Sequence, residues 1–264
     1  MIGAIVGDIV GSVYEGSNIK TTKFPFFNEF CFFTDDTVLT IAVADAILEG
    51  GTQLDRHELY VDKFHDYFCL YPDAGYGDTF FRWADRRQRA PYGSWGKGSA
   101  MRVSPIGYAY ETLDEVLKEA KLSAEVTHDH PEGIKGAQAI ASAVFLARQG
   151  ASKDEIRSYI ETTFAYDLSE TIEEIRPRYF FDVSCQGSVP QALIAFLEGE
   201  DFEDAVRKAI SIGGDSDTIG CMAGAVAGAF WGVPDEIADQ AMGFLDDRLR
   251  PIVEEFMQSY CARE

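Results

Sequence analysis

The chain has 264 residues, with 23 Lys+Arg against 44 Asp+Glu, which gives a formal net charge of −21 at pH 7. This length suffices for a buried core, and a hydrophobic content of 46% excludes a disordered acidic chain. An acidic surface repels phosphate, so we expect no direct binding to nucleic acid.

The cysteines and the apolar stretches point to one compartment. Five cysteines without a CxxC pair favour a reducing environment over a disulfide framework. The first residues are apolar but contain Asp8 and lack basic residues, unlike a signal peptide. The most apolar stretch, Ile219 to Val233, is shorter than the about 20 residues of a membrane span. We expect a cytoplasmic monomer that does not bind membranes.

Helical periodicity dominates the chain. Apolar residues share one helix face over residues 2–13 and again over 37–48. The best strand candidate is residues 179–184, YFFDVS, which have no partner run. No Ser/Pro-rich linker divides the chain. The patterns predict an all-α fold of about a dozen helices, compact in a single domain over residues 1–264.

Several helix starts carry recognisable signals. A Ser or Thr followed three residues later by Glu or Gln is a capping box. In the box that begins at Ser188, Pro190 is expected in the first helical turn. Pro131 and Pro234 open two further expected helices. The capping boxes begin at Thr112, Ser152 and Ser188.

Three segments depart from an ordinary helical pattern. Residues 17–33 are an aromatic-rich loop and residues 89–98 a Gly-rich one, and long loops in compact domains are often functional. Residues 217–232 have a glycine every fourth residue, at a cost of about 1 kcal/mol each against alanine. We expect a core helix packed closely against its neighbours. The alternative is that the glycines let a ligand approach.

Two acidic clusters, FTDDT (33–37) and GGDSDT (213–218), each precede an apolar helix. Either one alone is explained by helix capping. A cap uses one oxygen, however, whereas each cluster offers two carboxylates and flanking hydroxyls. If both helix starts meet, four carboxylates converge and their repulsion requires a cation. Such an all-oxygen set suits Mg²⁺, Mn²⁺ or Ca²⁺ and has room for two ions.

Six segments together form a more specific pattern. They are residues 3–16 (GAIVGDIVGSVYEG), 33–37, 93–107 (GSWGKGSAMRVSPIG), 127–137 (THDHPEGIKGA), 185–193 (CQGSVPQAL) and 213–229 (GGDSDTIGCMAGAVAGA). In this order the chain resembles the ADP-ribosylglycohydrolase family, which includes the dinitrogenase reductase-activating glycohydrolases. The resemblance implies an all-α enzyme with two Mg²⁺ ions, for which Mn²⁺ can substitute. Such an enzyme cleaves the N- or O-glycosidic bond between ADP-ribose and an acceptor, often a protein side chain.

The resemblance also implies roles for particular residues. Glu15 falls at the position of an active-site glutamate and is the candidate acid/base, with Asp36 as a second catalytic carboxylate. Without the resemblance, Glu15 is an exposed carboxylate at a helix end. The metal ligands would be Thr34, Asp35, Asp36, Asp215, Asp217 and Thr218.

The Gly-rich loop can approach an anion closely through its backbone N–H groups, and a helix is expected to start near Ser99. The alternative is an ordinary Gly-rich turn. By the resemblance, this loop holds the diphosphate and distal ribose of the substrate. The ligand-binding candidates are Gly93, Ser94, Trp95, Gly96, Lys97, Gly98, Ser99, Met101 and His128.

The chain departs from the family pattern at two positions. Lys97 stands where asparagine is usual, and its ammonium could pair with a diphosphate or change which acceptor fits. Ser94 stands where arginine-directed relatives are expected to have an acid, which favours an O-linked acceptor. His128 and His130 are either cap residues or face the ligand, and no third nitrogen or sulfur ligand nearby supports zinc. Cys185 has no catalytic partners and is interpreted as a packing residue.

Two alternatives to a glycoside hydrolase stay open. The first is a non-catalytic binder of ADP-ribose or another nucleotide, like the crystallins of the same fold, which Lys97 and the missing acid at position 94 favour. The second is a two-metal phosphohydrolase, which suits the Asp clusters but leaves the Gly-rich loop unexplained.

Overall fold

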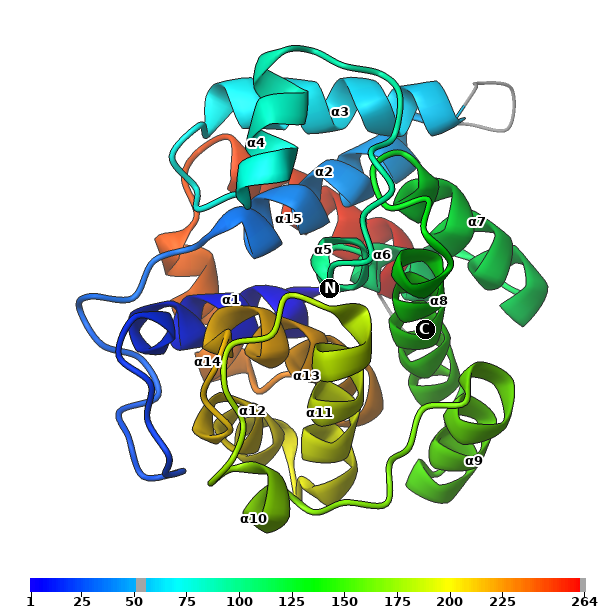
Figure 1. The fold of residues 1–264 in the computed structure, drawn as a ribbon. Helices are drawn as coiled ribbons and strands as arrows, with labels where there is room; N and C mark the ends of the chain where they lie inside the picture. The colour runs from blue at the N-terminus through cyan, green and yellow to red at the C-terminus, as the bar shows by residue number, and fades with distance from the viewer. Residues whose placement is uncertain (51–55, 262–264) are drawn as a thin grey trace.

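The computed structural model describes residues 1–50 and 56–261. These residues form helices joined by loops and no strand, so the all-α prediction is confirmed (Figure 1). The helices are α1 (Ile2–Glu15), α2 (Asp35–Glu49), α3 (Arg56–Leu70), α4 (Asp78–Asp85), α5 (Gly98–Met101), α6 (Ser104–Ala109), α7 (Leu113–Glu125), α8 (Pro131–Arg148), α9 (Lys153–Phe164), α10 (Ile172–Ile175), α11 (Cys185–Glu198), α12 (Phe202–Ser211), α13 (Ser216–Trp231), α14 (Asp235–Phe244), α15 (Leu249–Phe256) and a π-helical turn, η1 (Met257–Cys261).

Helices α1 and α13 lie against each other at the centre of the fold (Figure 1). A Cβ atom placed on Gly7 would lie 2.0 Å from the carbonyl oxygen of Gly220, and one on Gly3 would lie 2.2 Å from that of Gly224. Only glycine permits this approach, because real Cβ contacts are not that short. The prediction of a closely packed core helix over 217–232 is therefore confirmed.

The other helices surround this pair. Helices α8, α11 and α12 pack on α13, and α2 packs on α1, α3 and α15. Both α1 and α13 are buried over most of their length, so their side chains face protein on nearly all sides. None of the helices in residues 1–50 and 56–261 is both long enough and apolar enough to cross a bilayer.

The helix-start predictions have mixed outcomes. The capping boxes at Thr112 and Ser152 are present, and α8 begins at Pro131. The box at Ser188 is wrong, because α11 starts three residues earlier, at Cys185. Ser184 caps this helix by accepting a hydrogen bond from the N–H of Gly187, 2.9 Å away, so Pro190 lies inside the helix instead of in its first turn.

The strand prediction for residues 179–184 is also wrong. This segment makes a single antiparallel bridge, between Ser184 and Gly96 of the Gly-rich loop. On either side of it, the N–H of Lys97 donates to the carbonyl of Val183 and the N–H of Cys185 to that of Trp95. Backbone hydrogen bonds join the segment to this loop only around Ser184, so no strand ladder forms.

Candidate active site

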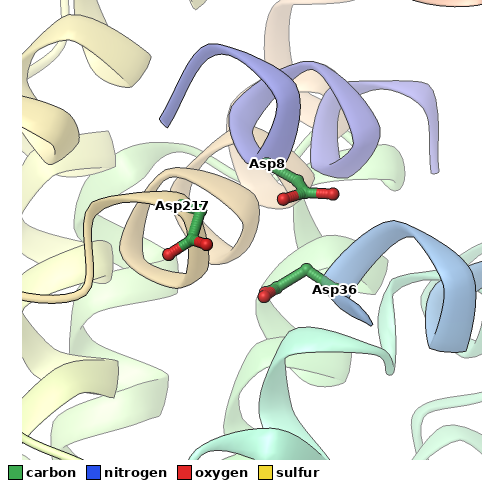
Figure 2. Close-up of side chains that lie close together, drawn as sticks. All are labelled: Asp8, Asp36 and Asp217. Atoms are coloured by element: carbon green, nitrogen blue, oxygen red, sulfur yellow. The ribbon is translucent and has the colours of Figure 1, made fainter. Parts of the chain in front are cut away.

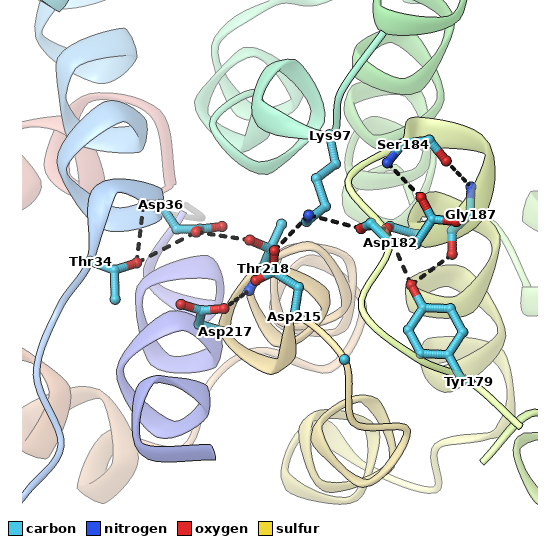
Figure 3. A network of polar contacts seen from close by, with 12 residues as sticks. Thr34, Asp36, Lys97, Tyr179, Asp182, Ser184, Gly187, Asp215, Asp217 and Thr218 are labelled. Carbon is cyan, nitrogen blue, oxygen red and sulfur yellow. Dashed lines mark hydrogen bonds and ion pairs between the residues drawn. The ribbon is translucent and has the colours of Figure 1, made fainter. Parts of the chain in front are cut away.

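The two acidic clusters meet in space, although they lie far apart in the sequence. The hydroxyl of Thr218, at the start of α13, donates to Oδ2 of Asp36, at the start of α2, over 3.1 Å and across 182 residues (Figure 3). Both helices direct their N-terminal ends at this point, which favours negative charge there. The convergence that the sequence required for a cation site is therefore present.

A further carboxylate, Asp8 of α1, joins the two clusters and was missed in the sequence. The carboxylates of Asp8, Asp36 and Asp217 offer oxygens within 4.8 Å of one another (Figure 2). Asp8 accepts the hydroxyl proton of Thr34 over 2.6 Å and the backbone N–H groups of Thr34 and Thr37. Asp8 thus fixes the start of α2, where the Thr34 hydroxyl oxygen in turn accepts the backbone N–H of Asp36 over 3.3 Å. An aspartate within an otherwise apolar helix was the signal that could have identified it.

The buried carboxylates of this group are poorly neutralised by the protein itself. Oδ1 of Asp36 is buried and has no hydrogen-bond partner in the described part of the chain. Burial, followed by the charges of Asp8, Asp35 and Asp215, raises the pKa of Asp36 well above its usual value. Burial and the neighbouring Asp215 raise the pKa of Asp217 in the same way. An unpartnered anionic oxygen in such surroundings fits a hard divalent cation.

Asp35, the first of the two acidic residues at the start of α2, lines the same cavity but belongs to neither close group of carboxylates. Its backbone N–H donates to the carbonyl of Ala74 over 2.7 Å. Burial, and then the charges of Asp8 and Asp215, raise its pKa to about 8. Asp35 therefore experiences the same concentration of negative charge as its neighbours.

A second carboxylate group consists of Glu15, Asp215 and Asp217, again with oxygens within 4.8 Å of one another. Glu15 ends α1 and is the exposed member of the group. Burial of part of the side chain, followed by the charge of Asp215, raises the pKa of Glu15. A carboxyl with a raised pKa at the edge of a cavity is suited to exchanging protons with a ligand.

The backbone before Asp215 is held by glycines and by the aromatic-rich loop. Gly213 and Gly214 have φ values of +75° and +71°, in the left-handed region that side chains disfavour. Asn18 accepts the N–H of Gly214 and donates to its carbonyl, both over 2.8 Å. Lys20 donates to the carbonyl of Ile212 over 2.5 Å. One function of the 17–33 loop is therefore to position Asp215.

Lys97 belongs to this second group instead of facing outward for a phosphate. Its ammonium forms an ion pair with Oδ2 of Asp215 at 2.6 Å and donates to the carbonyl of Asp182 at 2.9 Å (Figure 3). Lys97 is only 6% exposed. Although burial raises the pKa of Asp215, hydrogen bonding with Asp217 and the charge of Lys97 bring it below the usual value.

These residues line one cavity of about 710 Å³, within the size range of small-molecule sites. Ser99 is not in its lining, and its hydroxyl donates to the carbonyl of Gly133 over 2.7 Å. The sequence candidates that do line the cavity are Glu15, Thr34, Asp35, Asp36, Gly93, Ser94, Trp95, Gly96, Lys97, Gly98, Met101, His128, Asp215, Asp217 and Thr218.

The Gly-rich loop forms one wall of the cavity and is anchored by its own N–H groups. The N–H of Gly93 donates to Asp129, that of Gly96 to the hydroxyl of Ser94, and that of Lys97 to Val183. These three N–H groups are engaged within the protein, which differs from the expectation that the backbone of the loop is available to an anion.

The two histidines and the cysteine differ in their surroundings. His130 caps α8 by accepting the N–H of Glu132, as the capping interpretation predicts. His128 is buried against the cavity, and burial together with the charge of Arg102 lowers its pKa well below the usual value, so it is neutral at pH 7. Burial raises the pKa of the Cys185 thiol to about 12, which supports a packing role.

Comparisons with known proteins agree with this geometry. A family model described as ADP-ribosylglycohydrolase matches residues 1–264. The chain is 29% identical to ADP-ribosylhydrolase ARH3 of Mus musculus, over 92% of this chain and 86% of that protein. It is 24% identical to ADP-ribosylarginine hydrolase Tri1 of Pseudomonas putida (strain GB-1), over 88% of this chain and 70% of that protein.

A solved structure, an ADP-ribosylglycohydrolase-related protein complex, has the same fold. It superposes with a TM-score of 0.72 at 23% identity and covers 97% of this chain and 96% of its own. With the family model matching every residue from 1 to 264, the chain belongs to the ADP-ribosylglycohydrolase family.

Proposed function

We propose that this protein is a divalent-metal-dependent hydrolase that cleaves the glycosidic bond between ADP-ribose and an acceptor. The observation that carries the proposal is the cavity itself. Its floor is formed by acidic residues from α1, α2 and α13, and its wall is the Gly-rich loop. Membership of the family and the resemblance to ADP-ribosylhydrolases support the same activity.

The donor set fits magnesium, with manganese as a substitute. The side chains of the six proposed ligands offer only carboxylate and hydroxyl oxygens, which these cations prefer. The unpartnered Oδ1 of Asp36 and the raised pKa values of Asp36 and Asp217 support binding of positive charge there. When bound, such ions would orient the ribose hydroxyls and neutralise the negative charge of the carboxylates around them. The proposed ligands are Thr34, Asp35, Asp36, Asp215, Asp217 and Thr218.

The chain's own residues divide the remaining work. Glu15, with its raised pKa and exposed position, holds the proton that the departing acceptor takes. A water molecule then attacks the anomeric carbon and returns a proton to Glu15, which completes the hydrolysis. Asp36, which lines the cavity, supplies negative charge to the oxocarbenium-like state through which the bond breaks. Trp95 and Phe181, which line the cavity and are 46% and 56% exposed, offer apolar faces to a nucleobase.

The experiment is to measure release of free ADP-ribose from arginine-, serine- and nucleobase-linked substrates, with Mg²⁺ and with excess EDTA. We expect release that EDTA abolishes, and we expect an O-linked substrate to be preferred because Ser94 replaces the acid of arginine-directed relatives. Asp36→Asn should abolish release. Asp45→Asn is the matched control, because Asp45 lies on the same helix but pairs with Lys63 and Tyr67 away from the cavity.

Other outcomes contradict the proposal in distinct ways. Binding of ADP-ribose without release from any substrate would identify a non-catalytic binder. Release that survives EDTA would mean that the acidic residues only cap helices.

We further propose that the chain acts as a single-domain monomer in the cytoplasm, with α1, α2, α8 and α13 contributing to one continuous core.

A further inference from the structure

The two carboxylate groups of the cavity differ in how they are neutralised. Asp8, Asp36 and Asp217 have no Lys or Arg ion-pair partner in residues 1–50 and 56–261. The group of Glu15, Asp215 and Asp217 has one, because the ammonium of Lys97 lies 2.6 Å from Oδ2 of Asp215. One of the two groups thus already contains a cation supplied by the protein.

The surroundings of the Lys97 ammonium hold it at this position. It donates to the carbonyl of Asp182 over 2.9 Å and lies 4.9 Å from the centre of the Phe181 ring, whose face attracts cations. The backbone N–H of the same residue is bonded to Val183. The ammonium and Asp215 are both almost fully buried, so separating them would leave two unpaired charges out of water.

The family resemblance implies two bound divalent cations. We propose that in this protein the Lys97 ammonium takes the place of one of them. The protein then binds a single divalent ion tightly, between Asp36 and Asp217. Asp215, one of the six ligands proposed above, is neutralised by Lys97 instead. This inference rests on the proposed function, since it concerns the same metal site. Its physical basis is that a second ion would share a carboxylate with an ammonium, and like charges brought together in a buried site strongly oppose binding.

The test is to count bound Mn²⁺ per chain by the electron paramagnetic resonance signal of free Mn²⁺ during titration. We expect one tight site in the wild-type protein, with any second site at least about 100-fold weaker. Lys97→Asn and Lys97→Met both remove the charge and should each give two tight sites. Two variants are used because one of them can fail to fold, which circular dichroism detects.

Lys63→Asn is the matched control. Lys63 also neutralises two acids, Asp45 and Glu49, but outside the cavity, so its loss should leave one tight site. Two equally tight sites in the wild type would overturn the inference, as would a single site in both folded Lys97 variants. Either result is compatible with EDTA-sensitive release of ADP-ribose and so leaves the proposed function standing. No bound Mn²⁺ in the wild type would overturn both.

Discussion

Replacing Asp35 with asparagine tests whether the acidic site lowers the stability of the metal-free protein. In the folded chain, burial and the charges of Asp8 and Asp215 raise the pKa of Asp35 from 3.8 to about 8. Because the folded pKa lies above the unfolded one, stability falls as the pH rises from about 4 through about 8. Asparagine cannot ionise, so Asp35→Asn removes this loss.

The size of the effect follows from the pKa. Each unit corresponds to about 1.4 kcal/mol, so a rise of about four units sets an upper limit of roughly 5–6 kcal/mol above pH 8. Asp35 is partly exposed, and solvent screening reduces that limit. We expect a gain of roughly 2 kcal/mol, or about 4–8 °C in melting temperature for a domain of this size.

The assay is thermal unfolding in EDTA at pH 5, 7 and 9 for the wild type, Asp35→Asn and the control Asp45→Asn. The advantage of Asp35→Asn over the wild type should grow from pH 5 to pH 9, and that of Asp45→Asn should not. With Mg²⁺ at about 100 times its Kd, the wild type gains about 2.7 kcal/mol and the order reverses. An advantage that is equal at pH 5 and pH 9, or none at all, would refute the reasoning.

Three further predictions concern packing, proton transfer and base binding. Gly7→Ala should destabilise the protein in urea by about 3 kcal/mol or more, because its Cβ would meet Gly220. The exposed Gly243→Ala, with nothing within 4 Å of its Cβ, should not. Glu15→Gln should lower kcat by about 10²–10⁴ while ADP-ribose binding, measured by calorimetry, persists. Trp95→Ala should raise KM roughly tenfold or more at unchanged kcat, as loss of stacking on a base predicts.

Local patterns in the sequence identified the two acidic clusters and the Gly-rich loop, because these residues come in short runs, whereas the role of Glu15 came from the family resemblance. Thr34 with Asp36 and Asp215 with Asp217 are each read from five or six neighbouring residues. That the two runs meet is a property of the fold, since the contact spans 182 residues. Asp8 was missed because a single aspartate in an apolar helix gives no local sign of which side chains lie opposite.

Lys97 shows where residue type and position are insufficient. Its place in the Gly-rich loop was predicted, but its partner was not. The partner, Asp215, comes from the start of α13, and Asp182 comes from the extended segment that docks on the loop. The position of this ammonium therefore depends on three segments that are remote in sequence. No pattern within one segment predicts whether it faces a phosphate or a carboxylate.

The glycines of α1 connect the stability of the fold to the geometry of the cavity. A Cβ on Gly11 would lie 2.4 Å from the Cα of Asp217, so the closest approach of α1 to α13 continues into the acidic site. The same approach brings Asp8 and Glu15, which lie about two turns apart on α1, to the carboxylate of Asp217. A larger residue at Gly7 or Gly11 must push the helices apart and separate these oxygens. The close crossing of α1 and α13 requires glycines. The same crossing also concentrates negative charge at the site, which a bound cation would neutralise.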